Sequence, residues 1–338
     1  MKDFLLQLKQ WLIPQKNADR ATRRRQWTAC AAVAVVAVGM LASALFAGIL
    51  PGVARQSYAR LDALYSRADT DKASGEVYPR DMLTSFTKLY DKNSDLRGYL
   101  RFSSSTEDDY LDIAAPVVQT EKTDAYKNRL FTGGWNPVGC LRFDKKLYLT
   151  EEIHNNKSLV VYGNSNREGQ MLAPLLKLVG EERRAKYATR FSLDTLYETG
   201  DYLVFAVMLV DEKENKLWYF DGCETTFATN GTFLDYVCEI RARSLFNYPV
   251  DVAAGDRLAV LSTPAPKSVA KFSGARLVVV GRHLRSDEVI TTRSTAGVTK
   301  NPDVVMPRAW YVSQNVTMHP YYTETDYSVD NYRTMGKE

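Results

Sequence analysis

The chain has 338 residues, and its 44 Lys and Arg against 40 Asp and Glu give a formal net charge of only +4 at pH 7. So small an excess argues against a nucleic-acid-binding protein, because such proteins gain affinity by neutralising many phosphates. The length allows one large domain, or two ordinary ones, with appended segments.

The first 54 residues have the pattern of a membrane anchor. Residues 1–25 are basic, with an apolar helical face over residues 1–13 that favours a short amphipathic helix, and residues 26–54 carry no charge. That uncharged run exceeds the roughly 20 apolar residues that cross a bilayer as a helix. Because the basic flank comes first, the positive-inside rule predicts a single-pass signal-anchor with residues 1–25 in the cytoplasm and the rest outside. A cleaved signal peptide is the alternative, since Ala42 and Ala44 have suitable spacing, but the length of the apolar run favours the anchor.

The extracytoplasmic part divides by composition. Residues 55–75 are polar and rich in Ala, Arg and Asp, which predicts a helical stalk or linker. From 76 to 285, helical spacing of apolar residues over 79–96 is followed by short apolar runs at 97–102, 112–120, 139–144, 158–164, 201–211, 216–222, 256–263 and 275–284. Their length and their Gly, Asn, Asp and Pro punctuation predict an all-β barrel or sandwich. Residues 231–246 interrupt these runs as an amphipathic helix, with Arg241 on the solvent side. Residues 286–338 form a polar, Tyr-rich extension, expected to be an extended tail that partly packs on the domain.

Cysteine and histidine are sparse. Of the four cysteines, Cys30 lies in the apolar run, and the odd number outside it is no disulfide framework, although Cys223 and Cys238 could pair or stay free. No Cys/His cluster has the spacing of a metal site, so we expect neither a metal nor a cofactor.

Several segments together resemble a class B sortase, the membrane-anchored cysteine transpeptidases of Gram-positive cell surfaces. The resemblance runs from about Pro79 to Leu284. It is carried by "NSDLRGYLRF", "APVVQTEKTDAYKNRLFTGGWNPVGCLRFD", "SLVVYGNSNREGQMLAPLLKL", the helix and strand of 233–263, and "ARLVVVGRHL". It implies an eight-stranded β-barrel with N-terminal helices and one inserted helix between late strands.

The resemblance also implies a catalytic His in "YGHN", a nucleophilic Cys after "TLST", and an Arg that steadies substrate and oxyanion. This chain has Asn164 at the His position and Pro264 at the Cys position, and only Arg276 is retained. The nucleophile must be activated and the acid/base must change charge near neutral pH, which neither Asn nor Pro can do. Ser262 and Thr263 adjoin the vacant position, but a hydroxyl needs a base. With Asn166 and Gln170, they are candidates for lining a peptide groove.

We therefore expect a catalytically inactive sortase-like surface protein, a pseudo-sortase. Its expected partners are the cytoplasmic membrane and sorting-signal peptides, an active sortase, or pilin and other surface proteins. An active divergent sortase with another nucleophile, such as Ser262 or Cys140, is one alternative, and a purely structural surface protein is another.

Overall fold

A computed structural model describes residues 19–103, 111–150, 156–166, 169–180, 182–214, 227–288 and 297–323. The chain forms two compact units, Met1–Val53 and Ala54–Glu338. The predicted amphipathic helix over residues 1–13 lies outside the described residues, as does the apolar run at 216–222.

The first unit is helical. Helix α2 (Arg20–Ala44) begins after Asp19, whose carboxylate accepts hydrogen bonds from the backbone amides of Ala21 and Thr22. A π-helical turn η1 (Leu45–Ile49) follows and leads into α3 (Leu50–Asp62). None of the α2 residues is buried within the protein. By length and composition this helix could cross a membrane.

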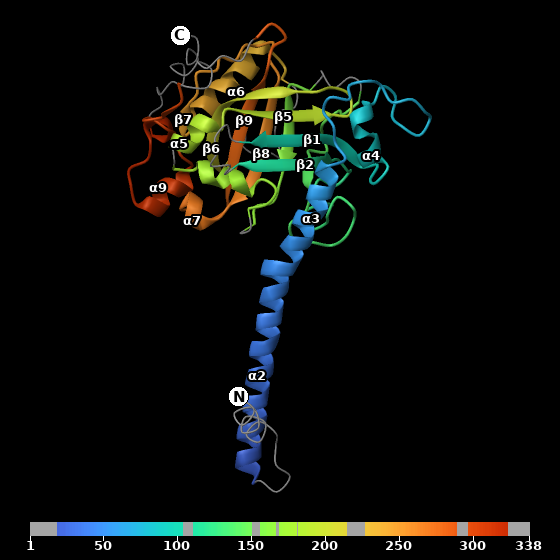
Figure 1. Ribbon diagram of the computed structural model, residues 1–338. Coiled ribbons are helices and arrows are strands. Elements are labelled where there is room, and N and C mark those ends of the chain that lie inside the picture. The colour runs from blue at the N-terminus through green and yellow to red at the C-terminus, as the bar shows by residue number, and fades with distance from the viewer. Residues whose placement is uncertain are drawn as a thin grey trace. The chain divides into compact units, whose positions relative to one another are not determined.

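The second unit is built on a closed barrel of eight strands in the order β1-β2-β3-β4-β8-β9-β6-β5. The β2–β3 and β4–β8 pairs are parallel and the others antiparallel. This architecture confirms the predicted fold class, and Figure 1 labels the strands β1, β2, β5, β6, β8 and β9 of the barrel. The strands are β1 (Leu96–Ser103), β2 (Asp112–Val118), β3 (Leu141–Phe143), β4 (Ser158–Tyr162), β5 (Arg190–Thr195), β6 (Asp201–Asp211), β8 (Leu258–Ala265) and β9 (Ala275–His283).

Burial on both faces explains why β6, β8 and β9 are almost continuously apolar. Helix α6 (Asn230–Arg243) packs against β6, and Figure 1 shows it beside the barrel. Thr229 begins α6 with a capping box. The prediction that Arg241 faces solvent is wrong: it is 4% exposed, donates a hydrogen bond to the carbonyl of Val250 and lies over the ring of Phe205.

The remaining helices are short and lie before β1, between strands or after the last strand. They are η2 (Thr84–Phe86), α4 (Thr87–Tyr90), η4 (Ala173–Leu178), α5 (Glu182–Tyr187), α7 (Lys267–Ala270), α9 (Arg308–Gln314) and η6 (Pro320–Tyr322). A separate two-stranded sheet pairs β7 (Phe246–Asn247) with β10 (Thr299–Lys300). Of the residues 79–96 with helical spacing, only those of η2 and α4 are helical, because the chain turns on either side of these two elements.

The segment 55–75 packs into the domain, which differs from the predicted linker. Tyr58 and Tyr65 are 6% and 8% exposed and belong to the hydrophobic core. Tyr65 stacks on Tyr99 at 4.2 Å between ring centroids and donates a hydrogen bond to Asp194 at 2.7 Å. The aromatic residues of this segment therefore belong to the barrel's core.

Residues 297–323 also pack on the domain. Tyr321 donates a hydrogen bond to Glu239 of α6 at 3.0 Å, and Asn301 donates one to the carbonyl of Ser244 at 2.8 Å. This stretch includes α9, where an extended tail was expected. Helix α9 buries Tyr311 in the hydrophobic core. The polar composition of this stretch gave no sign of that packing, so the helix was not predicted.

Candidate functional site

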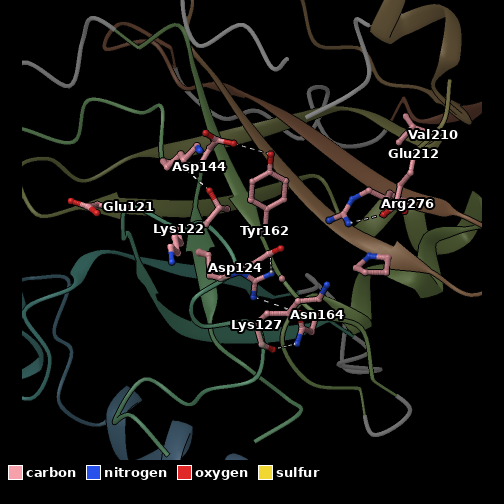
Figure 2. A pocket seen from close by; sticks show the side chains of 15 residues that line it. Glu121, Lys122, Asp124, Lys127, Asp144, Tyr162, Asn164, Val210, Glu212 and Arg276 are labelled. Atoms are coloured by element: carbon pink, nitrogen blue, oxygen red, sulfur yellow. Dashed lines mark hydrogen bonds and ion pairs between the residues drawn. The ribbon is translucent and has the colours of Figure 1, made fainter. Parts of the chain in front are cut away.

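A cleft of about 520 Å³ lies at one end of strands β3, β4, β8 and β9. Figure 2 shows its side chains, with Arg276 and Glu212 on one side of Tyr162 and Lys122 and Asp144 on the other. The lining residues are Glu121, Lys122, Thr123, Asp124, Lys127, Arg142, Asp144, Lys145, Tyr162, Gly163, Asn164, Val210, Glu212, Pro264 and Arg276.

The strand register aligns the central side chains. Arg142 pairs with Tyr162, Tyr162 pairs with Ser262, and Pro264 pairs with Arg276. Residues that face one another on adjacent strands point to the same side of a sheet, and so do alternate residues on one strand. The five side chains therefore share one face, the face of the cleft.

Arg276 is held in place by three contacts. Its Nε donates a hydrogen bond to the Ser262 hydroxyl at 2.8 Å, and its Nη1 donates one to the Glu212 carboxylate at 3.2 Å. Its guanidinium carbon lies 5.6 Å from the centroid of the Tyr162 ring. The Arg276 side chain is 18% exposed, so a fixed cation with accessible donors faces the cleft.

A second arginine, Arg142, lines the same cleft. Its side chain is 6% exposed, and its Nη1 donates hydrogen bonds to the carbonyl of Cys140 at 2.9 Å and to the Asn164 amide oxygen at 3.5 Å. The nearest carboxylate, that of Asp124, lies 4.0 Å from Nη2 and its side chain is 75% exposed. Burial is the main cause that lowers the pKa of Arg142, and repulsion from Arg276 is a weaker cause in the same direction.

The Asn164 side chain is fixed in the cleft wall by hydrogen bonds. Its amide nitrogen donates to the carbonyls of Lys127 at 2.5 Å and Pro137 at 3.2 Å, while its oxygen accepts from Arg142. A carboxamide does not gain or lose a proton near neutral pH. The position thus supports the loop but offers no acid/base group.

Pro264 is exposed near the end of β8. Strand β4 ends at Tyr162, opposite Ser262, so no β4 residue pairs with position 264. A residue without an amide hydrogen fits here because no ladder bond is lost. Pro264 presents only apolar atoms to the cleft and supplies no nucleophile.

The other predicted groove residues do not line the cleft. Ser262 is fully buried beneath Arg276, and Thr263 is fully buried with a hydroxyl that has no hydrogen-bond partner among the described residues. Asn166 accepts a hydrogen bond from the backbone amide of Gln170 at 2.8 Å, and Gln170 lines a different pocket of about 420 Å³. The structure therefore brings together Asn164, Pro264 and Arg276, with Ser262 as support.

The alternative reactive side chains are poorly suited to chemistry in the cleft. Cys140 is fully buried, and burial raises the pKa of its thiol to about 12. Cys238 is 2% exposed on α6, and His283 packs edge-on against Tyr202, with burial lowering its pKa. His154 and Cys223 lie outside the described residues. Within the described ranges, no group of three or more His, Cys, Asp or Glu side chains could hold a metal ion.

Four residues of the cleft were not predicted from the sequence: Arg142, Tyr162, Asp124 and Glu212. One signal was present: Arg142 is a charged residue within the apolar run "CLRF". A cation inside a buried strand indicates a partner or a site, but only the barrel register shows that it faces Asn164 and Tyr162.

Comparisons with known proteins agree with this fold. The chain is 27% identical over 221 residues to sortase B of Listeria monocytogenes, which covers 65% of this chain and 80% of the relative. A Bacillus anthracis protein described as similar to sortase B superposes with a TM-score of 0.54 at 24% identity, over 68% of this chain and 94% of that one. The Staphylococcus aureus sortase B–substrate complex gives 0.56 at 20% identity, over 71% and 100%. No family model matches the chain.

The chain thus has a sortase B-like fold, and its sequence is similar to a sortase B over 80% of that relative's length. The solved structures are covered almost completely, whereas about a third of this chain lies outside each superposition.

Proposed function

We propose that this protein is a membrane-anchored, sortase-like surface protein that binds peptides in the cleft without transpeptidation. The observation that carries this proposal is the pair Asn164 and Pro264. One is a hydrogen-bonded carboxamide and the other an exposed imino acid, at the positions where the resemblance implies a histidine and a cysteine.

Transpeptidation through a covalent intermediate needs a nucleophile and a group that transfers protons to and from the leaving and entering amines. Among the described residues, the cleft lining contains neither Cys nor His. Ser262 could act only with a base, and its hydroxyl is fully buried under the Arg276 guanidinium, which is a hydrogen-bond donor. These facts support an inactive site over an active site with another nucleophile.

Peptide binding is supported by what the cleft retains. Arg276 keeps donors toward a space of about 520 Å³, which is large enough for a short peptide segment. The S. aureus sortase B is solved in complex with a substrate. We therefore propose sorting-signal-like peptides as ligands, and an active sortase or pilin-type surface proteins as the other candidate partners.

The membrane location is proposed from the first unit. The apolar length of α2 and the arginines in its first turns favour a single-pass anchor with residues 1–25 in the cytoplasm and the barrel outside. The barrel would then face the cell wall, where a peptide-binding module meets surface proteins.

The test is a combined binding and cleavage assay on the full-length protein in detergent micelles. Fluorescent sorting-signal-like peptides are titrated by anisotropy, and the same mixtures are analysed by mass spectrometry. Lys122→Trp fills the cleft from an exposed lining position, and Lys88→Trp on α4 is the matched control, since Lys88 is exposed and outside the cleft. We expect binding without cleavage, weakened about tenfold or more by Lys122→Trp alone.

Cleavage by the wild type would show that the protein is an active sortase. Absence of binding by every peptide would contradict the peptide-binding role and would favour a purely structural surface protein.

A further inference from the structure

We propose that the cleft recognises a carboxylate, held between Arg142 and Arg276, and that a free carboxylate anchors the peptide ligand. This inference rests on the proposed peptide-binding function and specifies which peptides are bound.

The positive charge of the buried Arg142 side chain is only partly offset by nearby carboxylates and hydrogen-bond acceptors. Its Nε is buried and has no hydrogen-bond partner among the described residues, and Asp124 is the one carboxylate in ion-pair range, at 4.0 Å from Nη2. Burying a guanidinium away from water costs several kcal/mol unless an anion and hydrogen bonds offset it. A ligand anion at Nη2 would supply the missing charge.

Arg276 lies across Tyr162 from Arg142. Tyr162 pairs with Arg142 in the strand register, and the Arg276 guanidinium lies over its ring. Arg276 donates through Nε and Nη1, and its Nη2 makes no hydrogen bond to the described residues. Its carboxylate partner Glu212 is 46% exposed, so a ligand can displace it at little cost.

The charge balance of the lining selects a monoanion. Five cations and four carboxylates line the cleft among the described residues, which leaves one excess positive charge. One carboxylate, that of Asp144, already accepts hydrogen bonds from the Tyr162 hydroxyl at 3.0 Å and from the Lys146 amide at 2.8 Å. A single carboxylate neutralises the remainder, and the planar guanidinium fork matches its geometry.

Asn164 fits the same arrangement. Its amide oxygen faces Arg142 as a neutral acceptor at 3.5 Å. An imidazolium at that place would add a positive charge beside the Arg142 guanidinium, in a cleft that Arg276 also lines. The carboxamide is thus compatible with an anion-binding cleft, whereas a proton-transferring histidine there would have a lowered pKa.

The experiment compares three fluorescent hexapeptide pools on the full-length protein in micelles. The first has free C-terminal carboxylates and no Asp or Glu, the second is the same pool amidated, and the third is amidated with one Glu. The proteins are the wild type, Arg142→Met, Arg142→Lys, Arg276→Met and, as control, Arg190→Met. Arg190 is exposed on β5 and outside the cleft.

We expect the wild type to bind one of the carboxylate pools at least about tenfold more tightly than the amidated pool. Arg142→Met and Arg276→Met should reduce this preference to about twofold or less, whereas Arg190→Met should preserve it. Arg142→Lys keeps the charge and should retain part of the preference, which makes the result independent of whether Arg142→Met folds. The first and third pools distinguish a terminal from a side-chain carboxylate.

Equal binding of the amidated pool would overturn the carboxylate assignment and leave the proposed function intact. Binding of no pool would overturn both. Displacement of peptide by inorganic phosphate at lower concentration than by acetate would assign the site to phosphate and also overturn the proposal.

Discussion

The Nε of Arg276 donates a hydrogen bond of 2.8 Å to the hydroxyl oxygen of Ser262, a residue with no exposed surface. The bond joins neighbouring strands β9 and β8 and fixes the guanidinium over Tyr162. Position 262 thus orients the cation of the cleft, and it does so two residues before Pro264, on the same face of the strand.

Replacing Ser262 with Ala should therefore weaken peptide binding more than it weakens the fold. Loss of a hydrogen bond to a charged group costs about 1.5–3 kcal/mol locally, so we expect affinity to fall about tenfold to a hundredfold. Ser158→Ala is the control, because Ser158 is equally buried and its hydroxyl has no hydrogen-bond partner among the described residues. Anisotropy titration measures the affinity for peptide, and chemical unfolding measures the stability of the fold. Equal affinity in the two variants would show that Arg276 is oriented without Ser262.

Cys140 should be unreactive in the native protein. Its thiol is fully buried with a pKa raised to about 12, so almost no thiolate exists at pH 8. Iodoacetamide at pH 8 should modify Cys140 only after denaturant is added, as followed by peptide mass spectrometry. Rapid native alkylation at this site, or loss of any peptide turnover in Cys140→Ala, would support the alternative of an active sortase.

Glu288→Gln should destabilise the domain in a pH-dependent way. Glu288 pairs with Arg282, which is fully buried, and this hydrogen bonding lowers the pKa of the Glu288 carboxyl. A lowered folded-state pKa means stability that is present above the unfolded value of about 4.5 and lost as the pH falls below it. We expect a loss of about 3 kcal/mol at pH 7 and a smaller difference from the wild type near pH 4.

Urea unfolding between pH 4 and 7 measures this difference, with Glu76→Gln as an exposed control. A constant difference across that range would show that the Arg282–Glu288 charge pair does not stabilise the fold.

Removing residues 54–78 should destabilise the barrel domain. A chain that begins at Ala54 keeps Tyr58 and Tyr65 in the core, whereas one that begins at Pro79 removes both. Burial of each ring contributes about 2 kcal/mol, so the shorter chain should lose about 4 kcal/mol or fail to fold. Thermal unfolding of the two proteins tests this; equal midpoints would mean that the segment 55–75 is a linker after all.

Most of the barrel could be predicted because its strands are short apolar runs with turn residues between them. Strand β5 was missed because Ser192, Asp194 and Thr195 are polar, although the structure buries all three. Asp194 is buried by partners far along the chain, Tyr65 and Arg67. Such long-range compensation leaves no local pattern in the sequence.

The site was predicted in part. Asn164, Pro264 and Arg276 could be located because their strands carry recognisable motifs, and the structure places all three in one cleft. Arg142 required the pairing of β3 with β4, and the role of Ser262 required the pairing of β8 with β9. Register between strands depends on tertiary packing, so neither contact follows from the residues alone.

We propose that the cleft is a sortase site without its nucleophile and acid/base group. The most direct measurement is mass spectrometry of sorting-signal-like peptides incubated with the full-length wild type and with the Asn164→His/Pro264→Cys variant, both in micelles. We predict no product from the wild type and cleaved peptide, with an acyl-enzyme at position 264, from the double variant. Cleavage by the unmodified protein would contradict the account.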